Sequence, residues 1–275
     1  MSGPITFTLD LEDHRAPESR VERYPWLTRR VLEFLADRGV RGTFFVTGEI
    51  AERAPDLVRE VADAGHEIGF HGWHHTPLTS LTTVQLRADA KRGKALLEES
   101  SGTPVIGYRA PLFSLVPESH WAVEVLAEVG FTYSSSVLPA RNPLYGDQAA
   151  PVTAFRWPSG LIELPCPVAS IAGIGLPYLG GVYLRALPTP VSATARHVFG
   201  RNQMLWTYCH PYDFDADETF WVAPEVGRWG SRLLWYNRRR MFAKVDAVLR
   251  AGVAPPLGER LAALEVAGLP VWSSQ

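Results

Sequence analysis

Two histidines four residues apart are the first feature of this sequence that could bind a metal ion. They lie in the run His71-Gly-Trp-His-His75, directly after residues 67–70, which we predict to be a strand. If the run begins a helical turn, the imidazoles of His71 and His75 project from one face and can bind a single cation, whereas His74 points elsewhere. The spacing indicates half of a metal site.

An acidic group can complete that site. The run Asp10-Leu-Glu-Asp13 follows an apolar strand predicted over residues 5–10. Like charges crowded at the end of a buried strand need a cation or a shared proton. One carboxylate beside two imidazoles leaves positions open for water and substrate, which suits one catalytic divalent ion, Zn²⁺ first and Co²⁺, Mn²⁺ or Ni²⁺ as alternatives.

Two more strand ends carry polar groups. Arg109 follows the strand predicted over residues 105–108, where its guanidinium can orient an acidic side chain through a bidentate bond. The turn at Pro111 can aim the N–H of Leu112 at a developing oxyanion. His210 ends the strand predicted over 204–209, and beside a metal and an acid it can protonate a leaving amine. Taken singly, each of these residues could equally be structural.

Alternating strands and helices must position these residues. Apolar spacing predicts helices over residues 24–38, 51–64, 82–99, 118–129 and 231–250, between strands over 5–10, 42–46, 67–70, 105–108 and 204–209. Such alternation implies a parallel sheet with right-handed crossovers, open or closed into a barrel. Residues 139–190 are instead rich in Pro and Gly, with one hairpin around a turn at 158–160. We predict a single domain over residues 1–275, with an insertion at about 139–190 that walls a cleft.

Composition excludes several classes of protein. With 275 residues, 46% hydrophobic and 20% charged, the chain is an ordinary globular protein, and its net charge of -2 disfavours nucleic-acid binding. We interpret the Arg-rich residues 232–240 as a solvated helix face rather than a phosphate or membrane-surface patch. No run approaches the about 18 apolar residues of a spanning helix. No charged and apolar leader precedes Ile5, so we expect a cytoplasmic protein with Cys166 and Cys209 reduced, Cys209 as a buried structural residue.

In this order, the motifs resemble those of the polysaccharide deacetylase family, the NodB-homology or carbohydrate esterase family 4 enzymes. The matching segments are residues 10–13, 43–48, 66–75, 109–111 and 205–210. More narrowly, residues 108–114, 180–185 and 210–213 are similar to the bacterial branch found with exopolysaccharide and exosortase systems. The resemblance implies an α/β fold, a distorted (β/α)7 barrel with a long inserted loop and its site at the C-terminal strand ends.

The resemblance also implies a role for each motif residue. It makes Asp10 the general base, Arg109 its partner, His71 and His75 metal ligands, His210 the general acid and Leu112 the donor of an oxyanion-hole N–H.

This sequence departs from the usual pattern at two places. Leu11 separates acids that are adjacent in most relatives, so the third ligand is Glu12 or Asp13. The pleat places Glu12 on the side of Asp10, but Asp13 has the usual ligand chemistry and lies where the strand turns into a loop, so we narrowly favour Asp13. Ser134 stands where relatives often carry Asp, so an acid that tunes His210 must come from elsewhere, and Asp213 is the candidate.

The function that we expect is a metal-dependent hydrolase of linear amide bonds that removes an N-acetyl group from an amino sugar of a glycan or glycoconjugate, an exopolysaccharide or a sugar precursor. Alternatives are a deformylase or other amidase acting on a lipid- or nucleotide-linked sugar, and an inactive carbohydrate-binding relative. Both motif histidines argue against the metal-free ureide branch. The sequence does not predict an oligomeric state. Four aromatic residues could stack on sugars or pack in the core: Trp157, Tyr178, Tyr183 and Trp221.

Overall fold

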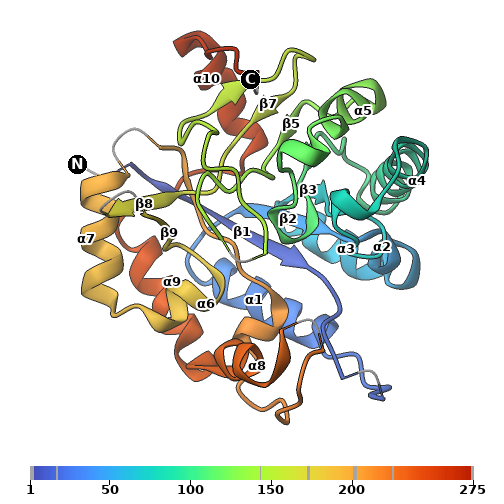
Figure 1. The fold of residues 1–275 in the computed structure, drawn as a ribbon. Coiled ribbons are helices and arrows are strands. Elements are labelled where there is room, and N and C mark those ends of the chain that lie inside the picture. Colours follow the sequence, from blue (N-terminus) through green and yellow to red (C-terminus); the bar gives the residue numbers. More distant parts are fainter. Residues whose placement is uncertain are drawn as a thin grey trace.

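A curled sheet forms the centre of the molecule. The computed structural model describes residues 3–16, 18–142, 144–171, 174–200, 203–224 and 226–273. Within them, eight strands form one sheet in the order β10-β1-β2-β3-β4-β5-β7-β6, and every neighbouring pair is parallel except β6 and β7. The strands are β1 (Ile5–Leu11), β2 (Gly42–Val46), β3 (Glu67–Phe70), β4 (Gly107–Tyr108), β5 (Tyr133–Ser134), β6 (Phe155–Arg156), β7 (Ile162–Glu163) and β10 (Leu205–Trp206). Helices surround this sheet (Figure 1), and the predicted distorted (β/α)7 barrel is confirmed.

The helices are α1 (Tyr24–Ala36), α2 (Gly48–Arg53), α3 (Pro55–Asp63), α4 (Thr83–Ser101), α5 (Ala122–Val129), α6 (Gly181–Ala186), α7 (Thr189–Phe199), α8 (Gly227–Trp235), α9 (Met241–Leu249) and α10 (Leu261–Ala267). Each of the five predicted helical stretches contains helix, while α6, α7 and α10 were not predicted. Helix α4 begins at a capping box in which Thr82 and Gln85 satisfy each other's backbone N–H groups, and it ends at Gly102 in the left-handed conformation. None of the helices described is long and apolar enough to cross a membrane.

Two predicted helices are interrupted. The helix expected over 51–64 is divided into α2 and α3 at Ala54, because the proline ring of Pro55 disfavours helical backbone at the residue before it. The helix expected over 231–250 is replaced by α8, the 3-10 turn η5 (Arg238–Arg240) and α9. Asn237 between α8 and η5 has a φ of 60°, which ends the helix there.

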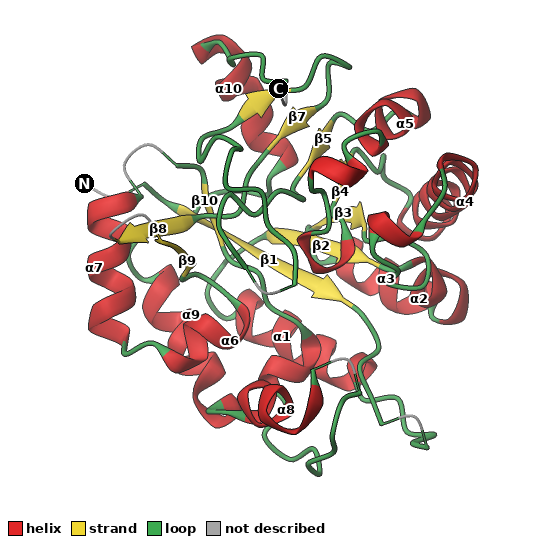
Figure 2. Cartoon of the chain, in the orientation of Figure 1, coloured by secondary structure: helices red, strands yellow, loops and turns green. Residues whose placement is uncertain are grey.

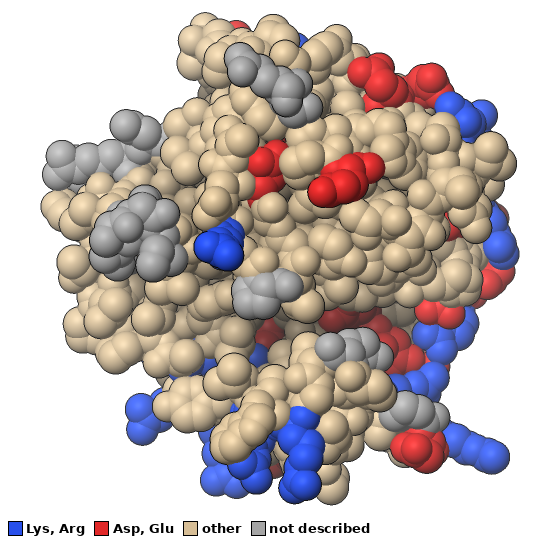
Figure 3. Space-filling model, in the orientation of Figure 1, with Lys and Arg blue, Asp and Glu red and all other residues tan. Residues whose placement is uncertain are grey.

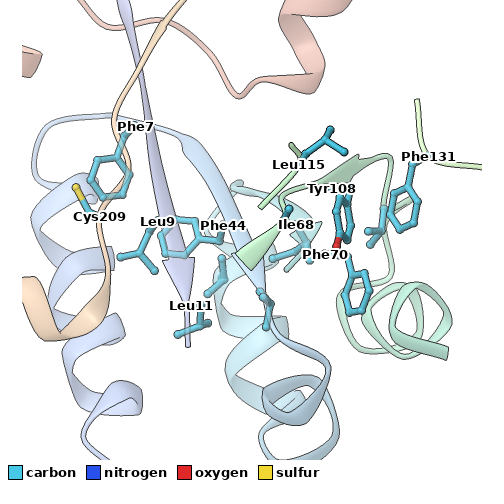
Figure 4. Packing of buried hydrophobic residues seen from close by; sticks show 14 of the residues in the cluster. Phe7, Leu9, Leu11, Phe44, Ile68, Phe70, Tyr108, Leu115, Phe131 and Cys209 are labelled. Carbon is cyan, nitrogen blue, oxygen red and sulfur yellow. The ribbon is translucent and has the colours of Figure 1, made fainter. Parts of the chain in front are cut away.

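Alternation along β1 divides the interior into two layers. Phe7, Leu9 and Leu11 pack against the surrounding helices together with Phe44 of β2, and Figure 4 shows these side chains side by side. Thr8 and Asp10 project to the opposite face of β1 because side chains alternate along a strand. All seven residues of β1 are buried, so the strand presents its polar face to the inside of the curl and not to solvent.

Part of the Pro- and Gly-rich stretch at residues 139–190 belongs to the main sheet. The predicted hairpin is confirmed as β6 and β7, but β7 also pairs in parallel with β5 and so extends the main sheet. Strands β8 (Val168–Ile171) and β9 (Ile174–Pro177) form a separate antiparallel pair. The strands β8 and β9 appear yellow beside α7 in Figure 2. That this stretch walls a cleft stays a prediction.

Candidate active site

Asp10 is the next-to-last residue of β1, and its carboxylate lies at the centre of the predicted site. Its Oδ1 accepts a 2.6 Å hydrogen bond from Arg109. Its Oδ2 lies 3.9 Å from Nε2 of His71 and 3.9 Å from Nε2 of His210. The structure therefore brings together four predicted residues that come from the ends of three different strands and the segment after β10.

Arg109 is a fully buried cation whose donors are satisfied. Besides its bond to Asp10, its guanidinium donates to Thr8 Oγ1 at 2.8 Å and to Ser135 Oγ at 3.0 Å. It also lies over the rings of Phe45, at 4.1 Å, and Trp206, at 4.3 Å. A buried charge with these contacts is held in one orientation. Thr8 and Ser135 were missed in the sequence, although Thr8 shares the face of Asp10 in the strand alternation.

Within the part of the chain that the structure describes, Glu12, His71 and His75 form a group that could hold a metal ion, with ligand atoms within 4.8 Å of one another. Nε2 of His75 lies 2.7 Å from the carboxylate of Glu12. Nδ1 of His71 lies 2.8 Å from the backbone carbonyl oxygen of Arg109. Because a carbonyl only accepts, Nδ1 carries the proton and Nε2 presents its lone pair, the tautomer that a metal ligand needs. Two imidazoles and one carboxylate fit a divalent ion such as zinc.

Asp13, the residue narrowly favoured as the third ligand, lies outside this group. Its carboxylate pairs with Arg53 at 3.3 Å and with Arg15 at 3.3 Å. The preference for Asp13 as third ligand needs correction. Strand β1 continues through Leu11, so side chains still alternate at residue 12, and Glu12 projects to the same side as Asp10. Asp13 then projects the other way, toward the arginines.

The segment that carries the two histidines is a bend and not the helical turn expected from their spacing. Gly72 has a φ of 74° and His75 a φ of 54°. Two contacts fix the bend. The N–H of Gly48 donates to the carbonyl oxygen of Gly72 at 2.9 Å, and the indole of Trp73 packs directly on Gly48. A Cβ at residue 48 would lie 2.5 Å from that indole, so only glycine fits there. His74 points away, as predicted, and pairs with Glu49 at 3.0 Å.

The electrostatics of this group suit metal binding. Burial lowers the pKa of His71 to about 4, so its ring is neutral at pH 7. Burial alone would raise the pKa of Glu12, but the charge of His75 and their hydrogen bond outweigh it and lower the pKa. Burial likewise would lower the pKa of His75, but the charge of Glu12 raises it. Glu12 is therefore ionised and His71 has its free lone pair, the states in which both bind cations.

His210 is held by the acid that the sequence analysis named. Its Nδ1 lies 3.0 Å from Oδ2 of Asp213, and its backbone N–H donates to the same oxygen at 2.8 Å. Asp213 is fully buried and pairs with the buried Arg185 at 3.0 Å. Burial would lower the pKa of His210, but the hydrogen bond to Asp213 and its charge raise the pKa to about 9. Arg185 was missed; its signal is a cation within the otherwise uncharged residues of α6.

The backbone at Leu112 is strained. Leu112 and Phe113 have φ of 58° and 55°, a left-handed conformation that costs about 1–2 kcal/mol for each such residue. The N–H of Leu112 has no hydrogen-bond partner among the described residues, and its side chain is 42% exposed. An unpaired N–H held at a strained turn is available to a ligand.

The four aromatic candidates divide into two kinds. Trp157 and Tyr178 are 2% and 0% exposed, so they pack in the core and do not face a ligand. Tyr183 and Trp221 are partly exposed, and Trp221 packs on His14 with ring centroids 5.0 Å apart. Cys209 is buried, and burial raises its pKa well above the ordinary value, which confirms the prediction of a structural thiol.

Comparison with known families accounts for most of the chain in two parts. Residues 17–134 match the polysaccharide deacetylase model, and residues 135–252 match a domain of unknown function, DUF3473. The first match contains His71, His75 and Arg109 and begins after Asp10. The second contains Asp213 and His210. The candidate site is thus built from both matched parts and from the strand that precedes them.

Similar proteins include a deacetylase and solved structures of the same fold. The peptidoglycan-N-acetylmuramic acid deacetylase PdaA of Bacillus subtilis is 43% identical over 60 residues, 22% of this chain and 23% of that protein. The chain therefore matches less than a quarter of the length of that relative. A solved structure described as a putative polysaccharide deacetylase from Mycobacterium smegmatis has a TM-score of 0.66 and 22% identity, covering 99% of this chain and 93% of that one.

A third similar structure bears on the difference between fold and activity. A CE4 family pseudoenzyme from Bacillus anthracis has a TM-score of 0.51 and 12% identity, covering 93% of this chain and 64% of that one. The fold is thus shared by proteins with and without the activity, and the site residues must be judged individually. From the two family matches and the motifs in the order described, residues 17–134 belong to the polysaccharide deacetylase family, and residues 135–252 that follow them are a DUF3473 domain.

Proposed function

We propose that the protein is a metal-dependent hydrolase that removes the N-acetyl group from an amino sugar of a glycan. One observation carries the proposal: a single carboxylate, Asp10, is fixed by Arg109 through one oxygen and faces the imidazoles of His71 and His210 through the other. An amide hydrolase needs a base beside the attacking water and an acid beside the leaving nitrogen. The imidazole of His71 belongs to the group that could hold a metal ion, and the imidazole of His210 lies outside that group.

Glu12, His71 and His75 would hold the metal. A divalent ion bound there supplies Lewis-acid polarisation of the amide carbonyl and a lowered pKa for bound water. The proposal of zinc, with cobalt, manganese or nickel as alternatives, rests on this donor set of two nitrogens and one carboxylate.

Asp10 acts as the general base. The bond from Arg109 to Oδ1 leaves Oδ2 to accept a proton, and both imidazoles lie 3.9 Å from Oδ2, beyond direct hydrogen-bond distance. Because Arg109 is itself fixed by Thr8 and Ser135, the carboxylate is presented in one orientation. Preorganisation of this kind reduces the cost of reaching the transition state.

His210 acts as the general acid and Leu112 as the oxyanion donor. With a pKa of about 9, His210 is protonated at pH 7 and can give its Nε2 proton to the departing amine. The unpaired N–H of Leu112 can donate to the carbonyl oxygen as negative charge develops there. Acetate and a free amino sugar are the products.

The substrate is proposed from the family branch. We propose an exopolysaccharide or its precursor as the acceptor because residues 108–114, 180–185 and 210–213 resemble the exopolysaccharide-associated branch, and residues 135–252 match DUF3473. An intracellular, cytoplasmic substrate is part of this proposal. The alternatives are a formamide on a lipid- or nucleotide-linked sugar, and carbohydrate binding without turnover. Acetate release separates them, since a deformylase releases formate and a binding protein releases neither.

The test compares Asp10→Asn with Asp13→Asn, two changes of the same kind three residues apart. Wild-type protein loaded with Zn²⁺ is expected to release acetate from N-acetylated chitooligosaccharides or from an N-acetylated exopolysaccharide. Asp10→Asn is expected to keep bound zinc and lose at least about 100-fold in turnover, the usual contribution of a general base. Asp13→Asn should retain both. Full turnover in Asp10→Asn would remove Asp10 from the mechanism.

A further inference from the structure

Helix α8 and the residue that follows it carry three large, exposed side chains. Trp229, Leu233 and Tyr236 are 78%, 56% and 53% exposed. They are four and three residues apart, so Trp229 and Leu233 lie on one side of the helix and Tyr236 follows at its end. We call these three residues the α8 ridge. A group of large apolar side chains exposed together marks an interaction surface.

Cations surround the α8 ridge. Residues 226–245 contain five arginines, one lysine and no acidic residue, in a chain whose net charge is -2. Arg232 lies over the ring of Trp229, at 5.0 Å from its centroid. Figure 3 shows Lys and Arg side chains gathered at the lower edge of the molecule, where Figure 1 labels α8. Among described residues, five of these six cations form no ion pair, namely Arg228, Arg232, Arg239, Arg240 and Lys244, and Arg238 pairs with Glu218.

Two hollows open among these cations. One, of about 310 Å³, is lined by Trp235, Asn237 and the three arginines of η5, with Asp215 and Ala216. The other, of about 360 Å³, is lined by Arg240 and Lys244 with Pro188, Thr189 and Ala243. The carboxylate of Asp215 is already paired with Arg23 at 2.5 Å. Arg240 lines both hollows, so an anionic group in either would meet at least one arginine.

We propose that the α8 ridge and the two exposed arginines of η5, Arg239 and Arg240, dock on an anionic membrane surface, in place of the solvated helix face expected from the sequence. The ridge would enter the boundary between headgroups and acyl chains, where Trp and Tyr are favoured, and the arginines would contact lipid phosphates. A soluble polyanion would use the cations but would leave Trp229 and Leu233 in water. A second copy of the chain related by twofold symmetry would place like charges opposite each other, which disfavours self-association through this face.

The surface lies next to the candidate active site. The guanidinium of Arg238 lies 5.3 Å from the ring of Tyr212, and that ring stacks on His210 with centroids 4.7 Å apart. Docking would therefore hold the catalytic residues beside the membrane. The substrate class that fits is an N-acetylated amino sugar carried on a membrane lipid, an assignment that rests on the proposed deacetylase function.

The test is sedimentation of the full chain with vesicles. Wild-type protein is expected to bind vesicles of equal parts phosphatidylcholine and phosphatidylglycerol and not to bind phosphatidylcholine alone. Arg239→Gln with Arg240→Gln should weaken binding about 25-fold, since each cation near an anionic surface contributes about fivefold. Trp229→Ser with Leu233→Ser should weaken it about tenfold or more.

Matched controls separate this surface from a general effect of charge or hydrophobicity. Arg59→Gln with Lys91→Gln removes two exposed cations from α3 and α4, and Val266→Ser removes a side chain of α10 that is 90% exposed. Both should bind vesicles as wild type does. The proposal is overturned if wild type does not bind anionic vesicles, or if Arg59→Gln with Lys91→Gln weakens binding as much as Arg239→Gln with Arg240→Gln does. It is also overturned if the chain is a dimer that Trp229→Ser with Leu233→Ser converts to a monomer.

Activity provides the independent readout. All variants should deacetylate a soluble chitooligosaccharide within about twofold of wild type, because none of the changed side chains contacts the catalytic residues, and the ridge and arginine variants should be slower only on a vesicle-bound acetylated glycolipid. Absence of activity in wild type with intact vesicle binding would count against the deacetylase function and leave the membrane surface standing. Equal rates of all variants on the glycolipid would count against the membrane-borne substrate.

Discussion

The hydrogen bond between His210 and Asp213 yields a quantitative prediction about pH. The pKa of His210 is raised to about 9 because the bond and charge of Asp213 outweigh burial. Asp213→Asn removes the charge, so the pKa should fall to the ordinary value of about 6.5 or below, since Arg185 then lies nearby without its counter-ion. The protonated form, which donates to the amine, is lost as pH rises through the pKa. The alkaline limb of activity should therefore move to lower pH.

The size of the effect depends on pH. At pH 8 a histidine with a pKa of about 9 is about nine-tenths protonated, and one with a pKa of about 6.5 is about 3% protonated, so kcat/KM should fall about 30-fold. At pH 6 both are largely protonated and the ratio should return to within about twofold. The assay is acetate release by the zinc-loaded protein between about pH 5.5 and about pH 10, which extends about one unit beyond each of the two pKa values.

Two companion variants test the cause. Asp213→Asn leaves Arg185 as an unpaired buried cation, which costs about 3–5 kcal/mol of stability, so thermal unfolding and zinc content must be measured for each protein. Arg185→Gln breaks the same ion pair but leaves Asp213 charged, and its alkaline limb should stay at or above the wild-type position. If Asp213→Asn lowers kcat/KM by the same factor at pH 6 and pH 8, the acid role of His210 is refuted.

Three further outcomes follow from the geometry. In equilibrium dialysis, Glu12→Gln should weaken zinc binding by more than about 100-fold and Asp13→Asn by less than about threefold, because Glu12 lies with the two imidazoles and Asp13 pairs with Arg53. A larger loss of zinc affinity in Asp13→Asn than in Glu12→Gln would restore Asp13 as the ligand. Leu112→Gly keeps the N–H and removes the left-handed strain, so turnover should change less than about twofold and the free energy of unfolding less than about 1 kcal/mol, and a large loss of turnover would mean that the side chain itself matters. Burial lowers the pKa of His66 to about 4, so the neutral ring contributes stability that is fully present above the unfolded pKa of about 6.5 and is lost as pH falls toward 4. Urea unfolding should show that the difference in free energy of unfolding between wild type and His66→Gln is about 2 kcal/mol smaller at pH 5 than at pH 7. The same difference at both pH values would contradict the lowered pKa of His66.

Local pattern was sufficient for much of the fold. The alternation of β1 and the spacing of Leu27, Val31 and Leu35 in α1 predicted the elements, because each residue must bury its apolar side against a neighbour wherever the chain runs. Pattern was insufficient where backbone conformation is decided by one residue. The breaks at Ala54 and at Asn237 interrupt stretches whose apolar spacing continues across them.

Residue type and motif order also identified the members of the candidate site. Asp10, His71, Arg109 and His210 were named from the ends of strands and lie together in the structure. Their meeting follows from topology, since the carboxyl ends of parallel strands share one edge of the sheet. The choice between Glu12 and Asp13 did not follow, because it depends on whether the pleat continues one residue beyond β1.

What the sequence determined by itself is therefore the inventory: which chemical groups are available, which strands carry them and which family they belong to. Only the tertiary structure decided the partners. Arg185 is more than twenty residues from Asp213 in the chain, yet the two form a buried pair that acts on His210. Likewise, Arg239 and Arg240 lie beside an apolar ridge only because helix α8 ends at Trp235 and the chain turns at Asn237. Contacts between residues that are distant in the chain depend on how surfaces pack in three dimensions, and the spacing of residues along the chain does not predict that packing.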